Sequence, residues 1–393
     1  MTPAARVQAA IEVLDAVIAA ARAGGAPADR VLSEWFRPRR FAGSGDRRAV
    51  RELVYAAIRA CGEVPADGRA AILLLAARDA SLAALFDGSR HGPASIAPGE
   101  APASAGIAPG WLETALADSG IAGEEALALL SRAPLDLRVN TLKAARDALE
   151  LPEKAELTVA GNGLRLPSGT AVDQWEAYRQ GLIEVQDTGS QLACEAVAAR
   201  PGETVIDLCA GAGGKTLALA AAMAGRGRLI ACDTVRARLA KLAPRAERSG
   251  VAMVETVLLD PGREIQALAG LAAKADAVLV DAPCSGAGTW RRNPEARWRM
   301  SPAELDRLAA LQARLLDLAA ALVRPGGRLV FVTCSLLDAE GADQAQAFLA
   351  RHPDWRADPP VLPAGRPRGQ GLRLTPHHDG TDGFFIARFA SPC

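Results

Sequence analysis

Hydrophobic residues recur at helical spacing through roughly the first 130 positions, where β-branched runs that would form strands are scarce. Over residues 46–59, for example, apolar side chains fall on one helical face and arginines occupy most of the other. A stretch rich in Gly, Pro, Ala and Ser at residues 87–110 predicts a long loop. The pattern therefore predicts an all-α region at residues 1–130.

From about residue 200 the pattern changes, because β-branched runs alternate with amphipathic helical stretches. The runs that predict strands lie at residues 204–208, 228–232, 254–258, 277–281 and 328–333, with a possible edge strand at 383–389, and the stretches that predict helices lie at 234–249 and 302–323. This alternation is typical of an α/β fold with a doubly wound, mostly parallel sheet. We therefore expect three regions, at residues 1–130, 131–200 and 201–393, of which the last contains the sheet.

Composition narrows the classes of function. Half of the 393 residues are hydrophobic, so a large core can form. The 45 basic and 45 acidic residues cancel, which argues against a strongly cationic, non-specific nucleic-acid binder but leaves room for local basic patches. The arginine face of residues 46–59, together with Arg37, Arg39 and Arg40, is either a solvated surface or a contact surface for an RNA backbone.

The cysteines and the apolar runs bear on compartment and metal content. Seven cysteines without regular spacing suggest reduced thiols, and the lack of a Cys-x-x-Cys pair leads us to expect no metal site. No apolar run approaches the roughly 18 residues of a membrane-spanning helix, so we expect no membrane association. The first residues lack the features of a secretion signal, and a cytoplasmic location is the expectation.

A glycine-rich turn follows the first predicted strand, in the sequence DLCAGAGGKT at residues 207–216. Gly211, Gly213 and Gly214 permit a tight turn and let a ligand approach the backbone closely. A phosphate-binding P-loop would need glycine where Cys209 stands, which argues against an ATPase.

Acidic residues after the next two strands favour a nucleoside ligand instead. Asp233 ends the second predicted strand, where a carboxylate can accept hydrogen bonds from ribose hydroxyls. Asp260 ends the third strand and could address the adenine end, although an acidic residue there is as often a helix N-cap.

Two cysteines end neighbouring predicted strands. The fourth strand ends in Asp281-Ala-Pro-Cys284 and the fifth in Thr333-Cys334. A doubly wound sheet brings both strand ends to the edge where ligands bind, so we expect the thiols to converge. A lone cysteine is usually a small buried hydrophobe, but two at this edge favour catalysis.

Methylation of carbon 5 of a pyrimidine is a reaction that needs such a pair. A thiolate that adds to carbon 6 makes carbon 5 nucleophilic, which is covalent catalysis. Asp281 would act near ring nitrogen 3 as a protonated acid, or while sharing a proton, and the second thiol would act as the base or assist release. Lys215 would either lower a thiol pKa or neutralise a carboxylate.

Residues 290–299, WRRNPEARWR, follow the first of these cysteines. Arginines and tryptophans beside the chemistry suit phosphate contacts and base stacking, although the tryptophans would also suit a packed core. The candidate RNA contacts are Arg291, Arg292, Arg297 and Arg299.

Several ordered motifs resemble the RsmB/Sun (NOP/Sun) family of RNA cytosine-5 methyltransferases. They are DLCAGAGGKT, DAPCSGAGTWRRNPEARW, PGGRLVFVTCS and DGFFIARF, preceded by RVNTLK at 138–143 and GLIEVQDTGSQL at 181–192. The resemblance covers roughly residues 130–393 and implies a Rossmann-like class I methyltransferase with S-adenosylmethionine as cofactor. It implies Cys334 as the nucleophile and Cys284 as the residue that releases the product.

The resemblance also implies cofactor contacts, a substrate and a helical domain. The implied cofactor contacts are Cys209, Ala210, Gly211, Ala212, Gly213, Gly214, Lys215, Asp233, Asp260 and Asp281. The N-terminal region resembles more weakly the NusB-like domain of the bacterial RsmB branch, which implies 16S ribosomal RNA as substrate. A transfer RNA substrate and a non-catalytic RNA-binding role remain alternatives, and we expect a monomer.

Two positions depart from the family pattern. Gly211 and Ala212 stand where the family usually has Ala-Pro, which should loosen the turn slightly. Gly341 follows Glu340 where the family often has Asn, which affects local helix capping or orientation rather than the thiol.

Overall fold

The computed structural model describes residues 1–393, which divide into two compact units. Unit 1 comprises Met1–Ser131 and Thr289–Pro302, and unit 2 comprises Arg132–Gly288 and Ala303–Cys393. This division differs from the expected contiguous regions, because a short segment from the middle of the sheet region belongs with the N-terminal helices.

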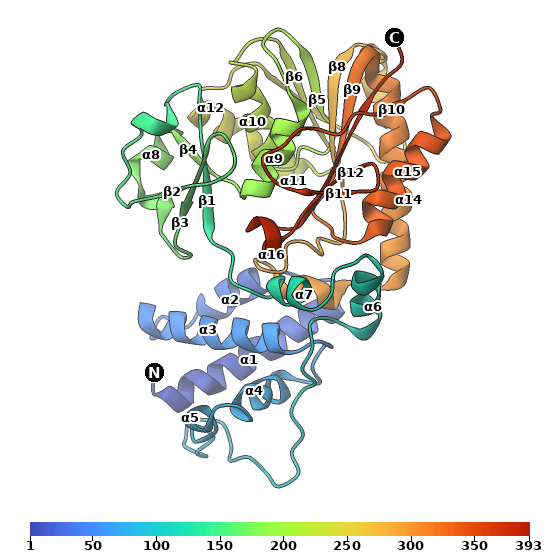
Figure 1. Cartoon of the computed structure of the whole chain (residues 1–393). Coiled ribbons are helices and arrows are strands. Elements are labelled where there is room, and N and C mark those ends of the chain that lie inside the picture. Colours follow the sequence, from blue (N-terminus) through green and yellow to red (C-terminus); the bar gives the residue numbers. More distant parts are fainter. The chain divides into compact units, whose positions relative to one another are not determined.

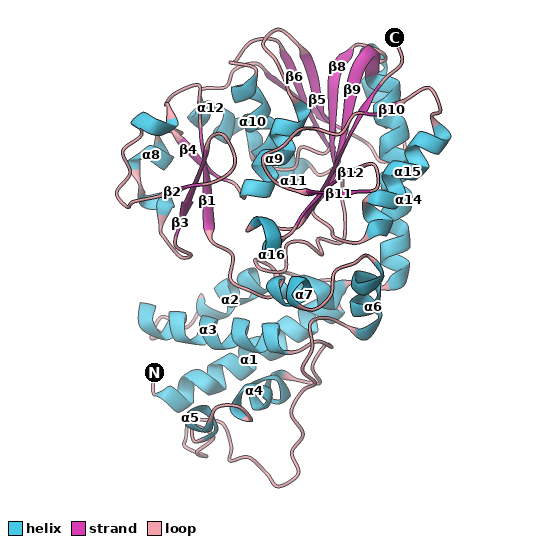
Figure 2. Cartoon of the chain, in the orientation of Figure 1, coloured by secondary structure: helices cyan, strands magenta, loops and turns pink.

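Unit 1 is helical, as the spacing of its apolar residues predicts (Figure 2). Its helices are α1 (Pro3–Arg22), α2 (Ala28–Phe36), α3 (Ser44–Ala60), α4 (Gly68–Ala76), α5 (Ala80–Ala83), α6 (Gly110–Asp118) and α7 (Glu124–Ala128). Helix α1 packs against α2, α3 and α4. On α3, Val50 and Val54 are buried and Arg48 and Arg51 are exposed, as expected. No helix interrupts the chain between α5 and α6, which confirms the predicted loop.

Unit 2 contains a large, mostly parallel sheet, which confirms the expected fold class. In spatial order its strands are β11 (Arg366–Arg368), β12 (Gly371–Leu374), β13 (Phe384–Ala390), β9 (Val323–Thr333), β8 (Ala275–Asp281), β5 (Thr204–Asp207), β6 (Arg228–Asp233) and β7 (Val254–Leu258), with β10 (Arg356–Ala357) paired to β13. The five strands from β9 to β7 pair in parallel, and β13 runs antiparallel to β9.

Two expectations about unit 2, one on a strand and one on a helix, are wrong in detail. Strand β13 is not an edge strand, since it lies between β9 and β12. The outer strands β11 and β12 are too short for their pattern to indicate strands beforehand. The helix predicted over 234–249 is broken into α11 (Arg236–Leu239) and α12 (Leu242–Ser249).

Alternate residues of the central strands pack against helices on opposite faces of the sheet (Figure 1). Val205 and Leu229 share a core with α9 and α10, whereas Ile206 and Ile230 share one with α14 and α15. Burial on both faces explains the continuous apolar runs of these strands. The helices of unit 2 are α8 (Glu176–Arg179), α9 (Thr188–Val197), α10 (Gly214–Ala222), α11, α12, α13 (Glu264–Leu268), α14 (Pro302–Leu322), α15 (Ala342–Arg351) and α16 (Pro376–Asp379).

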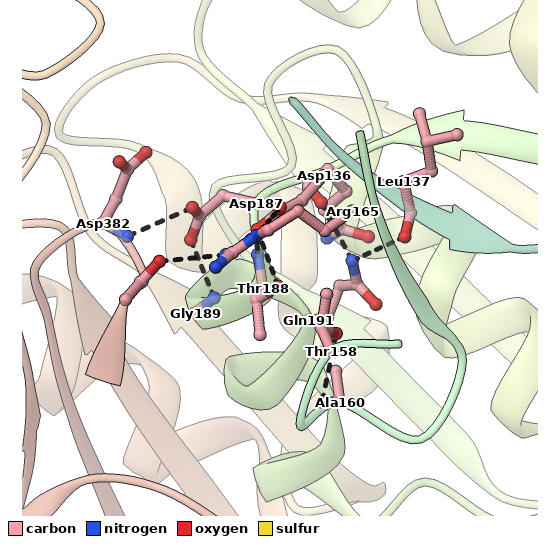
Figure 3. Close-up of polar contacts among 12 residues, drawn as sticks. Asp136, Leu137, Thr158, Ala160, Arg165, Asp187, Thr188, Gly189, Gln191 and Asp382 are labelled. Carbon is pink, nitrogen blue, oxygen red and sulfur yellow. Dashed lines mark hydrogen bonds and ion pairs between the residues drawn. The ribbon is translucent and has the colours of Figure 1, made fainter. Parts of the chain in front are cut away.

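A smaller antiparallel sheet precedes α9, in the order β2 (Glu156–Leu157), β3 (Gly163–Leu166), β1 (Leu135–Val139) and β4 (Ile183–Val185). Figure 3 shows Asp136 of β1 at the centre of its polar contacts. Its carboxylate accepts from Arg165 at 2.7 and 2.8 Å and from the amide and hydroxyl of Thr188 at 3.0 and 2.7 Å. Burial raises the pKa of Asp136, but the hydrogen bonds from Arg165 and Thr188 lower it by more. The net pKa is below its usual range, so the carboxylate is ionised. This charged contact fixes the start of α9 against the small sheet.

Candidate active site

The glycine turn joins β5 to α10 and has the tight geometry that its sequence predicts. The amide of Ala210 donates to the carbonyl of Cys232 at 2.8 Å, which ties the turn to β6. Gly211 and Gly213 have φ angles of 57° and 85°, in the left-handed region that favours glycine. A Cβ on Gly213 would lie 2.1 Å from Cδ1 of Leu242, so close packing also requires glycine there.

Asp233 holds this turn from the end of β6. Its carboxylate accepts from the amide of Gly211 at 2.8 Å and from the amide of Val235 at 2.7 Å. The amide of Leu259 donates to the carbonyl of Asp233 at 2.9 Å, and this brings the exposed Asp260 to the same edge of the sheet. Each carboxylate oxygen has a second lone pair, so Asp233 can still accept from a ligand hydroxyl.

Asp207 is a site residue that the sequence analysis did not single out. It ends β5, is fully buried, and accepts from the hydroxyl of Thr216 at 2.7 Å. Its other carboxylate oxygen has no hydrogen-bond partner. Burial raises the pKa of Asp207 to about 7. The signal was present, since Asp207 ends a strand as Asp233 does and begins the glycine-rich motif.

Lys215, at the start of α10, pairs with Asp281 at the end of β8. Its ammonium donates to the carboxylate at 2.7 Å and lies 5.5 Å from the ring centroid of Phe384. Burial lowers the pKa of Lys215, but the charge of Asp281 more than compensates and raises it above its usual range. Of the two roles left open for Lys215, neutralising a carboxylate is the one that this contact supports. Asp281 is therefore the ion-pair partner of Lys215 rather than an isolated carboxyl group.

The thiols of Cys284 and Cys334 lie in contact, with their Sγ atoms 3.4 Å apart. Both are free and half-buried. The loops that carry them are joined by the amide of Gly288, which donates to the carbonyl of Cys334 at 2.9 Å. The hydrogen bond with Cys334, followed by burial, raises the pKa of Cys284 well above its usual range. Cys284 therefore keeps its proton at neutral pH and can donate to Cys334.

The buried carboxylate of Glu340 stabilises the loops that carry the two cysteines. Glu340 accepts from the amide of Ser285 at 2.9 Å and also from its hydroxyl. Gln312 of α14 donates to Glu340 at 3.1 Å and to the carbonyl of Pro283 at 2.9 Å. The hydroxyls of Ser285 and Ser335, the residues after each cysteine, are 3.2 Å apart. These contacts fix the relative positions of the two thiols.

Gly341, the position that departs from the family pattern, lies against an aromatic ring. A Cβ there would be 2.8 Å from Cγ of Phe385, inside the van der Waals contact distance. Glycine therefore fits this packing, directly after the Glu340 carboxylate that binds the Cys284 loop.

Two of the four expected RNA contacts are wrong. Arg291 and Arg297 are buried, and Arg297 donates to the carbonyls of Ile58 at 2.6 Å and Cys61 at 2.8 Å. Trp290 and Trp298 are buried as well, so the interpretation of the tryptophans as core is confirmed. The pattern misled because arginines that bind backbone carbonyls have the same sequence signature as arginines that bind phosphates.

The other two arginines are half-buried. Arg299 donates to the carbonyls of Gly25 at 2.5 Å and Ala26 at 2.7 Å, which commits its guanidinium to unit 1. Arg292 stays a prediction. No group of three His, Cys, Asp or Glu side chains is arranged to bind a metal ion, and none of the helices has the length and apolar character needed to cross a bilayer.

Comparison with known sequences finds a protein family whose profile matches this chain. The profile of the family described as 16S rRNA methyltransferase RsmB/F matches residues 194–390. A protein of Synechocystis named probable ribosomal RNA small subunit methyltransferase B is 40% identical over 272 residues, which cover 64% of this chain and 59% of the relative. A Bacillus subtilis protein of the same name is 32% identical over 296 residues, which cover 71% and 65%. This chain thus spans less than two thirds of these relatives' length.

Solved structures resemble the chain in fold. A protein described as PH0851 superposes with a TM-score of 0.72 at 26% identity, covering 96% of this chain and 98% of that one. A methyltransferase homolog from Pyrococcus horikoshii gives 0.60 at 27% identity, covering 72% and 99%. NSun6 from Pyrococcus horikoshii, solved with SFG, gives 0.63 at 20% identity, covering 71% and 97%.

Proposed function

Because the chain belongs to the 16S rRNA methyltransferase RsmB/F family, we propose that it transfers a methyl group to carbon 5 of a cytosine in RNA, with Cys334 as nucleophile. The observation that carries the proposal is the 3.4 Å contact between the thiols of Cys334 and Cys284. One thiol would form the covalent bond and the other would help to break it.

S-adenosylmethionine is the cofactor of this family, and the residues at the strand ends fit such a nucleoside. A Cβ on Gly211 would meet open space, so the turn is not covered by other protein atoms at that position. Asp233 and Asp260 would receive the ribose and adenine ends, and residues 209–215 would line the turn. The bound cofactor supplies an electrophilic methyl group.

The pairing of the thiols supports Cys334 as the attacking group. The raised pKa of Cys284 keeps that thiol protonated, so its S–H can donate to Cys334. A hydrogen bond to a thiolate stabilises the charged form. In this proposal Cys334 adds to carbon 6 of the base, while the thiol of Cys284 keeps its proton.

Lys215 and Asp281 would act at the ring edge of the base. Addition of a thiolate to carbon 6 pushes electron density onto ring nitrogen 3. The ammonium of Lys215 keeps its own proton, because its pKa is raised, and donates to the carboxylate of Asp281. A proton taken from solvent and shared between Asp281 and nitrogen 3 would offset the negative charge that develops on the ring.

Release of the product would follow from the same thiol pair. The interaction with Cys334 is the largest cause of the raised pKa of Cys284. Once Cys334 is a thioether in the covalent adduct it carries no charge, so Cys284 loses its proton to water more readily. The resulting thiolate would remove the proton from carbon 5, and elimination of Cys334 would then restore the aromatic ring.

The first prediction concerns the two cysteines. Purified protein is incubated with methyl-labelled S-adenosylmethionine and, separately, with ribosomal and transfer RNAs that lack their modifications. We expect 5-methylcytosine with the wild-type chain, none with Cys334→Ala, and a protein–RNA adduct that resists denaturation with Cys284→Ala. Full methyl transfer by Cys334→Ala would disprove the assignment.

The RNA used in this assay also tests the substrate. The names of the relatives support small-subunit ribosomal RNA, and the assignment of such RNA implies a cytoplasmic site of action in bacteria. Label in transfer RNA alone would favour the transfer RNA alternative. RNA binding without label, in a chain that binds the cofactor, would favour a non-catalytic role.

A further inference from the structure

Helix α12 lies between the small antiparallel sheet and the glycine turn, all within unit 2 (Figure 1). The side-chain amide of Asn140, in the loop after β1, donates to the carbonyl of Ser249 at 2.9 Å. The ammonium of Lys143 donates to the carbonyl of Arg248 at 2.6 Å. A Cβ on Gly181, just before β4, would lie 2.2 Å from that same carbonyl oxygen. The small sheet and its loops therefore hold the C-terminal end of α12.

A buried carboxylate of the small sheet also binds the side chains of this helix. Glu184 of β4 is only 2% exposed. It accepts from Nη2 of Arg245 at 2.8 Å and from the guanidinium of Arg248. Burial raises the pKa of Glu184, but the hydrogen bonds from the two arginines lower it by more, so the carboxylate is ionised. Both arginines of α12 therefore share one buried negative charge.

Arg245 alone of these two arginines reaches the glycine turn. Nη1 of its guanidinium donates to the carbonyl of Ala212 at 2.7 Å, so one planar group joins the small sheet to the turn. No ring restricts the φ angle of Ala212, and a hydrogen bond to its carbonyl limits the conformations that the turn can adopt. Arg248 bonds the same Glu184, but its guanidinium lies 4.2 Å from the ring centroid of Tyr178 on α8.

We propose that Arg245 is a positioning residue for the binding of S-adenosylmethionine. Its bond to the carbonyl of Ala212 holds the glycine turn in the conformation that receives the cofactor, and Glu184 fixes the guanidinium that makes this bond. A turn that is ordered beforehand loses less conformational entropy when the ligand binds. The inference rests on the proposed function only in that the glycine turn receives the cofactor.

The test compares Arg245→Met with Arg248→Met in the full chain. Each variant removes one arginine of α12 and one bond to Glu184, and each leaves the other arginine paired with that carboxylate. Only Arg245→Met releases the carbonyl of Ala212. Isothermal titration calorimetry measures the Kd for S-adenosylmethionine. We expect Arg245→Met to raise this Kd by about 5- to 20-fold and Arg248→Met to change it by less than about twofold.

Amide hydrogen exchange of the glycine turn gives a second readout, which needs no cofactor. Peptides that cover residues 209–217 are followed by mass spectrometry. We expect their exchange to accelerate severalfold in Arg245→Met, because a less restricted turn opens more often, and to keep the wild-type rate in Arg248→Met. Urea unfolding should give the two variants similar free energies of unfolding, so a general loss of stability would not produce the difference between them.

The role of Glu184 is tested through Arg245. Because Glu184 acts by fixing the guanidinium, Glu184→Gln should raise the Kd less than Arg245→Met does. It should cause no further rise when the two substitutions are combined. Arg245→Lys keeps the charge but loses the planar fork, and we expect an intermediate Kd from it. This variant also serves as the milder substitution should Arg245→Met fail to fold.

The outcomes separate this inference from the proposed function. A folded Arg245→Met or Arg245→Lys variant with the Kd and exchange rates of Arg248→Met would overturn the positioning role. A wild-type chain that binds S-adenosylmethionine but methylates no RNA would overturn the proposed function, whereas the ratios of Kd would still decide the role of Arg245. A wild-type chain that does not bind the cofactor would overturn both.

Discussion

At the scale of single residues, acidic side chains end neighbouring strands of the sheet, and each has a different partner. Asp207 bonds a hydroxyl, Asp233 bonds two backbone amides, and Asp281 bonds an ammonium. Asp260 is exposed. The same residue type at the same kind of position therefore serves as a buried acid, a turn anchor, an ion-pair partner and an accessible acceptor, according to what surrounds it.

The raised pKa of Asp207 predicts a pH dependence of stability. An exposed Asp titrates near pH 4, so between about pH 4 and pH 7 the folded chain binds more protons at this group than the unfolded chain. Its contribution is present below about pH 4 and is lost as the pH rises to about 7, a difference on the order of 4 kcal/mol. Asp207→Asn removes the titration, so its stability relative to wild type should increase from pH 5 to pH 8.

Urea unfolding of the protein without cofactor at several pH values measures this effect. Asp118→Asn, at an exposed position in unit 1, is the control for the loss of one carboxylate. If the difference between Asp207→Asn and wild type is constant, Asp207 is ionised in the folded chain and its pKa is not raised.

The sequence revealed the positions of these residues better than their partners. Cys284 and Cys334 could be placed together because strand ends of a doubly wound sheet share an edge. Glu340 and Asp207 were not predicted as site residues, because their importance comes from burial and from the hydrogen-bond donors around them. Both follow from packing between elements that are distant in sequence. Arg291 and Arg297 were misassigned for the same reason, since an arginine is usually exposed unless it is paired.

At the scale of elements, the glycine turn between β5 and α10 is held by contacts on both sides. Asp233 bonds its first half, and Leu242 of α12 packs against its second half so closely that Gly213 has no room for a side chain. The break between α11 and α12, which the amphipathic pattern did not predict, precedes this leucine. The local sequence gave no sign of the break because both halves keep helical periodicity.

Substitution of the two glycines should separate strain from crowding. Gly213→Ala introduces both a left-handed alanine and a clash with Leu242, and we expect it to lower the free energy of unfolding by roughly 3 to 4 kcal/mol. Gly211→Ala introduces only the left-handed alanine, because no atom lies within 4 Å of its Cβ, and should cost about 1 to 2 kcal/mol. Denaturant unfolding of both variants checks the order; equal costs would mean that Leu242 moves aside freely.

The strands of the sheet could be predicted where their burial gives the sequence a run of apolar residues. The strands β9, β8, β5 and β6 are largely buried, and their apolar runs identify them, whereas the edge strand β7 contains two exposed residues. Strands β11 and β12 contain arginines and span only three and four residues, so they lack such a run. The position of β13 within the sheet could not be known without them.

At the scale of the whole molecule, a chain of zero net charge would have to attract RNA, its proposed substrate, through local patches. The helix α3 presents Arg48 and Arg51 to solvent, and this exposed face was one of two candidate surfaces in the sequence. The other, in residues 290–299, is largely occupied with holding unit 1 together. The resemblance of unit 1 to NusB stays a prediction.

RNA binding should therefore depend on α3. The double variant Arg48→Gln/Arg51→Gln should weaken binding and reduce the slope of log Kd against log salt concentration by about 1 to 2, one for each lost phosphate contact. Arg307→Gln/Arg351→Gln removes the same charge from ion pairs in unit 2 and should leave the slope unchanged. Filter binding at several salt concentrations measures both variants. The same slope for Arg48→Gln/Arg51→Gln as for wild type would show that the exposed face of α3 does not contact RNA.

The placement of residues 289–302 in unit 1 has a consequence for synthesis of the chain. N-terminal domains commonly fold first as they leave the ribosome. Here the helices of residues 1–131 emerge while Glu295, Arg297 and Trp298 have not yet been translated. At ordinary elongation rates roughly 10 to 30 s pass before that segment is made. During this interval the N-terminal helices lack part of their core, so apolar side chains that Trp298 later covers remain in contact with water.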